Sequence, residues 1–93
     1  MNTTQLECFV TVAECLNFSK AADILKLTQP AVSHQIRSLE EELEVKLFHR
    51  TSKNVSLTQE GLLFLADAHL ILKTALSAKR RLEDHTPIIP FEL

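Results

Sequence analysis

The stretch from Ser19 to Leu43, SKAADILKLTQPAVSHQIRSLEEEL, constrains the fold of this chain more than any other part of it. Its apolar residues recur at helical spacing, and Ser19 and Thr28 each offer a side-chain oxygen that can cap a helix. Pro30 is tolerated in the first turn of a helix, where its missing N–H has no partner to lose. The pattern predicts a short helix, a tight turn and a longer helix. This is either a helix-turn-helix of the kind that reads DNA or an ordinary corner between two core helices.

The charges of the chain are segregated along the sequence. None of the twelve Asp and Glu residues falls in the windows Ile24–Leu39 and Val45–Gln59, whereas five of the ten Lys and Arg residues do: Lys26, Arg37, Lys46, Arg50 and Lys53. The net charge of −2 argues against a general polyanion binder, but a segregated basic face is what neutralisation of DNA phosphates requires. The alternative is chance clustering of a few charges.

The length of 93 residues allows one small domain with a modest core. The N-terminus lacks the basic and then apolar pattern of a signal peptide, and we expect no apolar run of the roughly 20 residues that a membrane span needs. These features predict a cytoplasmic protein without membrane contact.

The two cysteines, Cys8 and Cys15, fall two turns apart on one predicted helix. Two turns rise by about 11 Å, which is too far for a disulfide between them. No cluster of Cys and His predicts a metal site. The thiols are therefore either buried and reduced or part of a redox sensor.

We expect Thr3 or Thr4 to cap a first helix that runs to about Leu16, before a break at Asn17–Phe18. Its amphipathic stripe consists of Leu6, Phe9, Val10, Ala13 and Leu16.

An acidic run ends the second helix of the Ser19–Leu43 stretch: Glu40, Glu41, Glu42 and Glu44. Carboxylates at a helix C-terminus oppose the helix dipole. They either repel this end from phosphates, leaving the N-terminal half to face DNA, or form an ordinary solvated face.

The segment from Val45 to Thr58, VKLFHRTSKNVSLT, predicts a two-stranded hairpin with Lys53 and Asn54 near its tip. So small a sheet is stable only when it packs against helices. A helix-turn-helix followed by such a hairpin is a winged helix, and the combination is more specific than either part.

A long helix capped by Thr58 is predicted from about Gln59 to about Asp84. We expect one apolar stripe along it, made of Leu62, Leu65, Ala66, Leu72, Leu76 and Leu82, with Leu63, Leu70 and Ile71 on neighbouring faces. The preceding segments are too small to cover this stripe, so it predicts a partner surface. The partner is either a second copy of the chain or a domain that follows, and the tail TPIIPFEL predicts a hinge into a longer protein.

Six motifs occur in order: F-x-x-V-A-E from Phe9, NFSKAA from Asn17, L-x-L-T-Q-P-A-V-S from Leu25, Q-I-R-S-L-E from Gln35, L-F-H-R from Leu47 and L-T-Q-E-G from Leu57. Together they resemble the N-terminal domain of LysR-type transcriptional regulators. The resemblance covers Leu6 to about Leu82. It departs from the family at Glu44, where a glycine usually follows the leucine and forms a left-handed cap.

The resemblance implies a mainly α fold: a winged helix-turn-helix of three helices and a two-stranded wing over residues 1–58, then a linker and dimerisation helix over 59–85. Residues 86–93 would begin a C-terminal effector-binding domain. It further implies a dimer that reads an interrupted palindrome in double-stranded DNA, with tetramers possible in the full-length protein. No cofactor is expected in this domain, and a small-molecule effector would bind the C-terminal domain.

The second helix of the motif should enter the major groove by its N-terminal turns. Gln29, Ser33 and His34 are expected to face the bases, with Pro30 able to touch a thymine methyl. Gln29 is able to present a donor and an acceptor together to adenine. His34 reads a base, contacts a phosphate or is only a solvated surface residue. A phosphate contact is expected from Arg37, and the hydroxyl of Thr28 either bonds a phosphate or serves only as a cap. Lys53 on the wing is expected in the minor groove or at the flanking phosphates. Arg50 either contacts a phosphate or holds the hairpin to the body.

The dimer interface is expected to contain Leu65, Leu72, Leu76 and Leu82.

Two other classes of protein remain as alternatives to a DNA-reading protein. One is a helical interaction protein with a silent winged-helix motif, and the other is a winged helix of another family, such as a molybdate-responsive regulator. An enzyme is not expected, because the chain has no pairing of a nucleophile with a base and only one glycine, too few for a phosphate loop.

Overall fold

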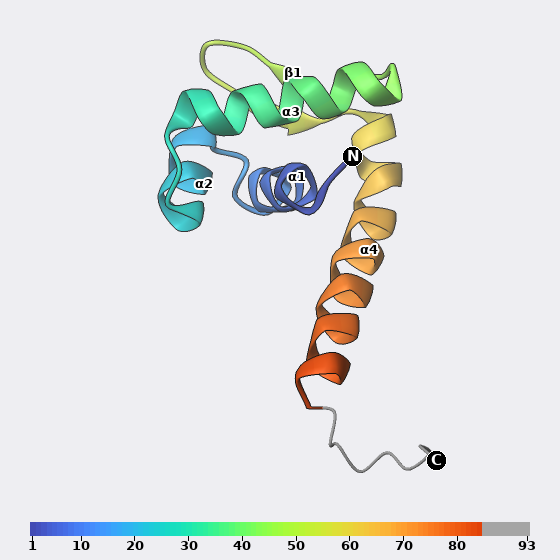
Figure 1. Cartoon of the computed structure of the whole chain (residues 1–93). Coiled ribbons are helices and arrows are strands. Elements are labelled where there is room, and N and C mark those ends of the chain that lie inside the picture. The colour runs from blue at the N-terminus through green and yellow to red at the C-terminus, as the bar shows by residue number, and fades with distance from the viewer. Residues whose placement is uncertain (85–93) are drawn as a thin grey trace, which may run out of the picture.

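The computed structural model describes residues 1–84 of the 93-residue chain, and the predicted hinge at 86–93 lies outside the described residues. The elements are α1 (Thr3–Cys15), α2 (Phe18–Leu25), α3 (Gln29–Leu43), β1 (Phe48–Arg50), β2 (Val55–Leu57) and α4 (Gln59–Glu83). Residues 1–58, here called the head, are compact, and α4 projects from the head as a single long helix (Figure 1). The predicted winged helix-turn-helix with a long C-terminal helix is confirmed.

Two of the four predicted helix caps are wrong by one or two residues. Asn2, not Thr3 or Thr4, caps α1, because its side chain accepts the N–H of Gln5 at 2.8 Å while the Gln5 side chain accepts the N–H of Asn2 at 3.1 Å. Asn17, not Ser19, caps α2 by accepting the N–H of Lys20 at 2.8 Å. In both cases an asparagine, which caps as well as serine or threonine, precedes the hydroxyl residue.

The caps of the other two helices are confirmed. The hydroxyl of Thr28 accepts the N–H of Ala31 at 3.2 Å, and Pro30 lies in the first turn of α3. The hydroxyl of Thr58 accepts the N–H of Gly61 at 2.9 Å and donates to the carbonyl of Lys46 at 2.6 Å. Thr58 therefore fixes both the start of α4 and its junction with the head.

The first three helices end in left-handed residues that are not glycine. The φ angles are 48° at Leu16, 58° at Lys26 and 58° at Glu44. After α3, the N–H of Val45 donates to the carbonyl of Glu40 at 3.2 Å and that of Glu44 donates to Glu41 at 3.3 Å, which closes the helix as a glycine cap would. Glu44 thus keeps the usual turn into the wing at a conformational cost of about 1–2 kcal/mol.

The wing is the predicted hairpin. β1 and β2 pair antiparallel with Phe48 opposite Leu57 and Arg50 opposite Val55, and Lys53 and Asn54 lie in the turn between them. Thr51 closes this turn, since its hydroxyl accepts the N–H of Asn54 at 2.9 Å. The hairpin presents Phe48 to the core, where the ring lies 5.5 Å from Phe9 and 5.9 Å from Phe18 between centroids.

The core of the head is formed by residues from every helix and from the wing. Its largest fully buried side chains are Phe9, Leu6, Ile36, Leu39, Leu47, Val12, Val32 and Cys8. Ala21 and Ala22 of α2 are buried as well, and their small side chains allow α3 to cross α2 closely. Gly61 serves a similar purpose in α4, because a Cβ there would lie 2.1 Å from the carbonyl oxygen of Leu47.

The predicted stripe of α4 divides between a face that packs against the head and a face that is exposed. Phe64, Leu65, Ala68 and Leu72 pack against the core of the head. Leu62, Leu63 and Leu70 are 65%, 76% and 61% exposed on the other side. The prediction was wrong because the head covers one side of the first half of α4, which the sequence pattern did not anticipate.

Residues 1–84 extend 61 × 25 × 19 Å, and their radius of gyration of 16.5 Å exceeds the roughly 12 Å of a compact domain of this size. The radius of gyration is large because the second half of α4 extends beyond the head (Figure 1). Leu76 and Leu82 lie in this second half and are 49% and 78% exposed.

α4 also corrects the expectation that no segment is apolar enough to span a membrane. Its 25 residues are long and apolar enough to cross a membrane by length and composition alone. Asp67 and Lys73 interrupt its apolar residues, and each would cost about 2.5–3.5 kcal/mol at the centre of a bilayer. Together with the packing of α4 on the head, these charges favour an amphipathic interface helix.

Candidate nucleic-acid interface

The N-terminal half of α3 presents polar side chains on the surface of the head. Gln29, Pro30, His34 and Arg37 are exposed and Ser33 is half-buried. All but His34 line one shallow hollow. Amide, hydroxyl and guanidinium groups are those that pair with base edges in the major groove. The structure therefore brings together the residues predicted to read bases, and their contact with DNA stays a prediction.

Two of these residues are held by side chains from outside α3. The hydroxyl of Ser19, in the first turn of α2, donates a hydrogen bond to Oε1 of Gln29 at 3.2 Å. Nη1 of Arg50, the last residue of β1, donates to Oγ of Ser33 at 2.8 Å. Sequence reasoning missed both contacts, because each joins residues that only the tertiary fold brings together.

Arg50 is the most constrained cation of the site. Its guanidinium lies over the ring of Phe18 at 4.5 Å from the centroid, and Nη2 approaches Oε1 of Glu40 at 3.6 Å. Burial lowers the pKa of Arg50, the carboxylate of Glu40 opposes that shift, and Arg37 adds to it. These contacts favour the second of the two predicted roles, in which Arg50 holds the hairpin to the body.

Glu40 differs from the rest of the acidic run. Its side chain is only 4% exposed, and Oε2 accepts the backbone N–H groups of Leu47 at 2.7 Å and Phe48 at 3.3 Å. The expectation that the run as a whole is solvated or repels phosphates is wrong for Glu40, which satisfies the backbone where the wing begins. Glu41, Glu42 and Glu44 are exposed at this end of α3.

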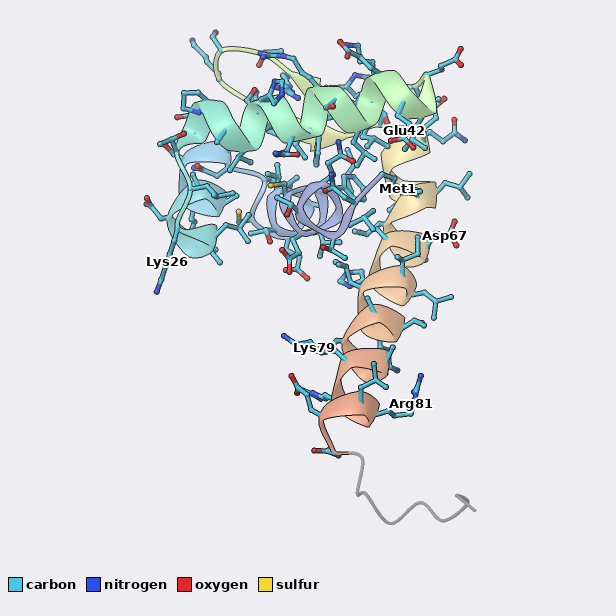
Figure 2. All side chains as sticks on the ribbon, viewed as in Figure 1. Met1, Lys26, Glu42, Asp67, Lys79 and Arg81 are labelled. Carbon is cyan, nitrogen blue, oxygen red and sulfur yellow. The ribbon has the colours of Figure 1, made fainter. Side chains whose placement is uncertain are left out.

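Glu42 forms an ion pair with the N-terminal amino group of Met1, so the C-terminal end of α3 is joined to the start of the chain (Figure 2). Figure 2 also shows that Lys26 extends from the end of α2 away from α3 and the wing. Lys26 therefore does not share the surface formed by the N-terminal half of α3, although the sequence placed it in an acid-free window.

A cleft of about 330 Å³ separates α3 from the wing and continues the interface toward β1 and β2. Its walls come from the loop before α2, the start of α3 and the wing turn, and include Asn17, Ser19, Gln29, Ser33, Arg50 and Lys53. Lys53 is exposed in the turn, and Thr28 is exposed at the start of α3 with its hydroxyl oxygen engaged as a cap. The cleft is lined mainly by hydrogen-bond donors and hydroxyls, which suits contact with the sugar–phosphate backbone of DNA.

No group of His, Cys, Asp and Glu among residues 1–84 is arranged to hold a metal ion. His49 and His69 belong to no such group, and His85 lies outside the described residues. Both cysteines are free: Cys8 is buried, with its pKa raised by burial and by the nearby charge of Glu7, and Cys15 is half-buried.

The residues predicted for the dimer interface divide between the two halves of α4. Leu65 and Leu72 pack against the core of their own head, whereas Leu76 and Leu82 are exposed. An exposed hollow on the outer face is lined by Gln59, Leu62, Leu63 and Ala66. The apolar surface left open for a partner is thus the outer face of α4, with the distal half of the helix.

Residues 3–62 match the family model described as "Bacterial regulatory helix-turn-helix protein, lysR family". A helix-turn-helix type transcriptional regulator of Azotobacter vinelandii, from the ibpB-leuC intergenic region, is 42% identical over 84 residues, which are 90% of this chain and 58% of that protein. A hydrogen peroxide-inducible genes activator of Pectobacterium carotovorum is 47% identical over 73 residues, which are 78% of this chain and 24% of that protein.

Among solved structures, a complex of the CbnR DNA-binding domain with DNA is similar, with a TM-score of 0.85 and 37% identity. The match covers 89% of this chain and 95% of that one, whereas the chain spans only 58% and 24% of the two curated relatives. The match to the family model runs from the start of α1 to the first turn of α4 and includes α3 and the wing. The chain belongs to the LysR family of bacterial helix-turn-helix regulatory proteins.

Proposed function

We propose that this chain is the DNA-binding part of a transcriptional regulator, in which α3 enters the major groove and the wing contacts the flanking backbone. One observation carries the proposal: the exposed half of α3 is free of acids, and its Gln29 and Ser33 are held in place by other elements. Fixed polar side chains on an open helix are what base recognition needs. A relative of the same fold in complex with DNA supports this proposal.

In this proposal Gln29 and Ser33 contact base edges and Pro30 contacts a thymine methyl. His34 and Arg37 lie further along the exposed side of α3 and contact a base or the backbone. Thr28 and Lys53 contact phosphates on either side of the groove, which positions the head without reading sequence.

A second copy of the chain is the partner that we propose for the outer face of α4. Two heads joined through their α4 helices would present two α3 helices, which fits an interrupted palindrome with two half-sites. We also propose that the full-length protein is cytoplasmic, that it has a C-terminal domain that binds a small-molecule effector, and that it can form tetramers. In this proposal the protein has no enzymatic activity.

The alternative is an interaction protein that uses α4 and has a silent winged helix. Two rounds of measurement distinguish it from the DNA reader. The chain is first used to select sequences from a random duplex pool at low salt, and binding to the enriched duplex is then followed by fluorescence anisotropy from about 50 to 200 mM salt. A DNA reader enriches a defined site and loses affinity steeply with salt, and failure to enrich any sequence would refute the proposal.

Lys53→Ala tests the role of the wing within this assay. A lysine that contacts a phosphate adds about one unit to the slope of the logarithm of the binding constant against the logarithm of the salt concentration. The variant should therefore lose affinity for specific and random duplexes to the same extent, and its slope should be flatter. Lys79→Ala, which removes a charge from the distal half of α4, is the control and should leave the slope unchanged. An unchanged slope for Lys53→Ala would remove the wing from the interface.

A further inference from the structure

The contact between Ser19 and Gln29 fixes which way the amide of Gln29 points. Oγ of Ser19 lies 3.2 Å from Oε1 of Gln29. A carbonyl oxygen only accepts hydrogen bonds, so the hydroxyl of Ser19 is the donor. The acceptor end of the amide is thus drawn toward α2, and the NH₂ group, with two donors, is turned the other way. Both residues are exposed, so this group is accessible to a ligand.

The contact between Arg50 and Ser33 orients the hydroxyl of Ser33 in a similar way. A guanidinium only donates hydrogen bonds, so Oγ of Ser33 accepts from Nη1 of Arg50 at 2.8 Å. The hydroxyl hydrogen of Ser33 must then point to another acceptor. Arg50 cannot easily move away, because the Phe18 ring lies beneath it and Glu40 lies at its other nitrogen.

Gln29 and Ser33 are four residues apart and share one hollow on α3. Each accepts a hydrogen bond from a residue outside α3, which turns the oxygen of the Gln29 amide and one side of the Ser33 hydroxyl toward that residue and leaves a donor of each for a ligand. We propose that Ser19 and Arg50 are positioning residues that set base preference, by making this part of α3 a donor surface that reads acceptor atoms in the major groove. The inference rests on the proposed function, and it adds the chemical class of base that is read.

The acceptors that such a surface would meet are N7 and O6 of guanine and O4 of thymine. Cytosine presents only its N4 amino donor at the same edge and would leave the donors unpaired. Adenine presents an acceptor beside a donor, and the two-sided contact of a free glutamine with adenine requires the amide oxygen to face the base, whereas Ser19 draws this oxygen toward α2. Gln29 and Ser33 should therefore each contact guanine or thymine in the major groove and bind cytosine more weakly.

The test begins with the enriched duplex of the selection described above. Base pairs whose identity ceases to matter in Gln29→Ala and Ser33→Ala locate the two contacts, and each of these pairs is then changed to all four bases. The wild-type chain should prefer guanine or thymine over cytosine by roughly two- to ten-fold per contact, the range expected of one hydrogen bond. A preference for cytosine at either pair would overturn the inference.

Ser19→Ala tests the positioning role directly. Without the hydroxyl the amide of Gln29 is free to turn, so adenine at the Gln29 pair should gain roughly two- to ten-fold relative to guanine and thymine. Ser56→Ala, an exposed serine of β2 outside these contacts, is the matched control and should keep the wild-type preference. A Ser19→Ala variant that binds more weakly but with unchanged base preference would show a merely structural role and overturn the assignment.

Gln29→Glu provides a test in the opposite direction. A glutamate keeps the oxygen that accepts from Ser19 but replaces the outward NH₂ group by a second acceptor, so the preference should change to cytosine at that pair.

Arg50→Lys keeps the positive charge but loses the planar guanidinium with its several N–H donors, and it should relax the base preference only at the Ser33 pair. Failure of the wild-type chain to enrich a sequence refutes the proposed function, whereas enrichment with unaltered preferences in these variants refutes only this inference.

Discussion

The carboxylate of Glu40 accepts the backbone N–H of Leu47 at 2.7 Å, which joins the last turn of α3 to the residue that precedes the wing. Leu47 is fully buried, so its N–H has no access to water and needs a protein partner. The same carboxylate also accepts from Phe48 and faces Arg50. One buried charge therefore supports the turn into the wing, the start of β1 and the arginine that positions Ser33.

Glu40→Ala should lower the free energy of unfolding by about 3–5 kcal/mol, because it leaves two buried N–H groups without their acceptor and the Arg50 guanidinium without its ion-pair partner. Urea unfolding followed by circular dichroism measures this loss. Glu41→Ala, on the exposed side of the same helix turn, is the control and should change the value by less than about 0.5 kcal/mol. Equal effects of the two substitutions would show that the Glu40 contacts contribute little.

Gly61→Ala should destabilise the chain, although alanine favours an α-helix by about 1 kcal/mol over glycine. The added Cβ would lie 2.1 Å from the carbonyl oxygen of Leu47 and 2.9 Å from Cδ2 of Leu57. Moving α4 away from the wing to relieve this overlap should cost about 1–3 kcal/mol. The reverse change at an exposed site in the distal half of α4, Ala75→Gly, gives the intrinsic helix effect. A Gly61→Ala variant that gains the whole of this effect in stability would refute the close approach.

Glu44→Gly should stabilise the chain by about 0.5–1 kcal/mol, since Glu44 has a φ of 58° that glycine adopts without strain. Part of the gain from relieved strain is lost again to the greater freedom of glycine in the unfolded chain. Glu41→Gly in the helical part of α3 should instead destabilise by about 1 kcal/mol. Thermal unfolding of the two variants should thus shift in opposite directions.

Leu63→Asp should dissociate the proposed dimer without unfolding the head, because Leu63 is 76% exposed on the outer face of α4. Sedimentation velocity measures the change, and Thr4→Asp, which adds the same charge to the exposed start of α1, is the control. Leu72→Asp is a poorer test, since Leu72 packs against the core of its own head and its loss would also destabilise the monomer. A Leu63→Asp variant that sediments as a dimer would exclude the outer face.

The stability of the chain should fall above about pH 8.5, the pKa of a thiol in an unfolded chain. Burial raises the pKa of Cys8 in the folded state, so its stabilising contribution is complete below the unfolded pKa and is lost as the pH rises through the folded pKa. Urea unfolding from pH 7 to 10 measures the decline. The chain has no tyrosine to titrate in this range, and Cys8→Ala should be less stable at pH 7 but lack the Cys8-dependent part of the decline.

Most of the fold could be predicted from local sequence because it depends on local physics. Helical spacing of apolar residues, hydroxyl caps at Thr28 and Thr58, and the turn-prone run before Asn54 each act within a few residues. The same local reasoning erred where two capping residues compete closely. Asn2 and Asn17 each stand one or two residues before the hydroxyl residues that were expected to cap.

The sequence by itself thus determined that this chain forms a winged helix-turn-helix with a long helix, and which residues of α3 are candidates to face DNA. Only the tertiary structure decided that Glu40 is buried, that Ser19 and Arg50 donate hydrogen bonds to Gln29 and Ser33, and which face of α4 is open. These features depend on contacts between residues far apart in the chain. The periodicity of a helix shows that a side chain lies on one face, but not which neighbour meets that face once the elements pack.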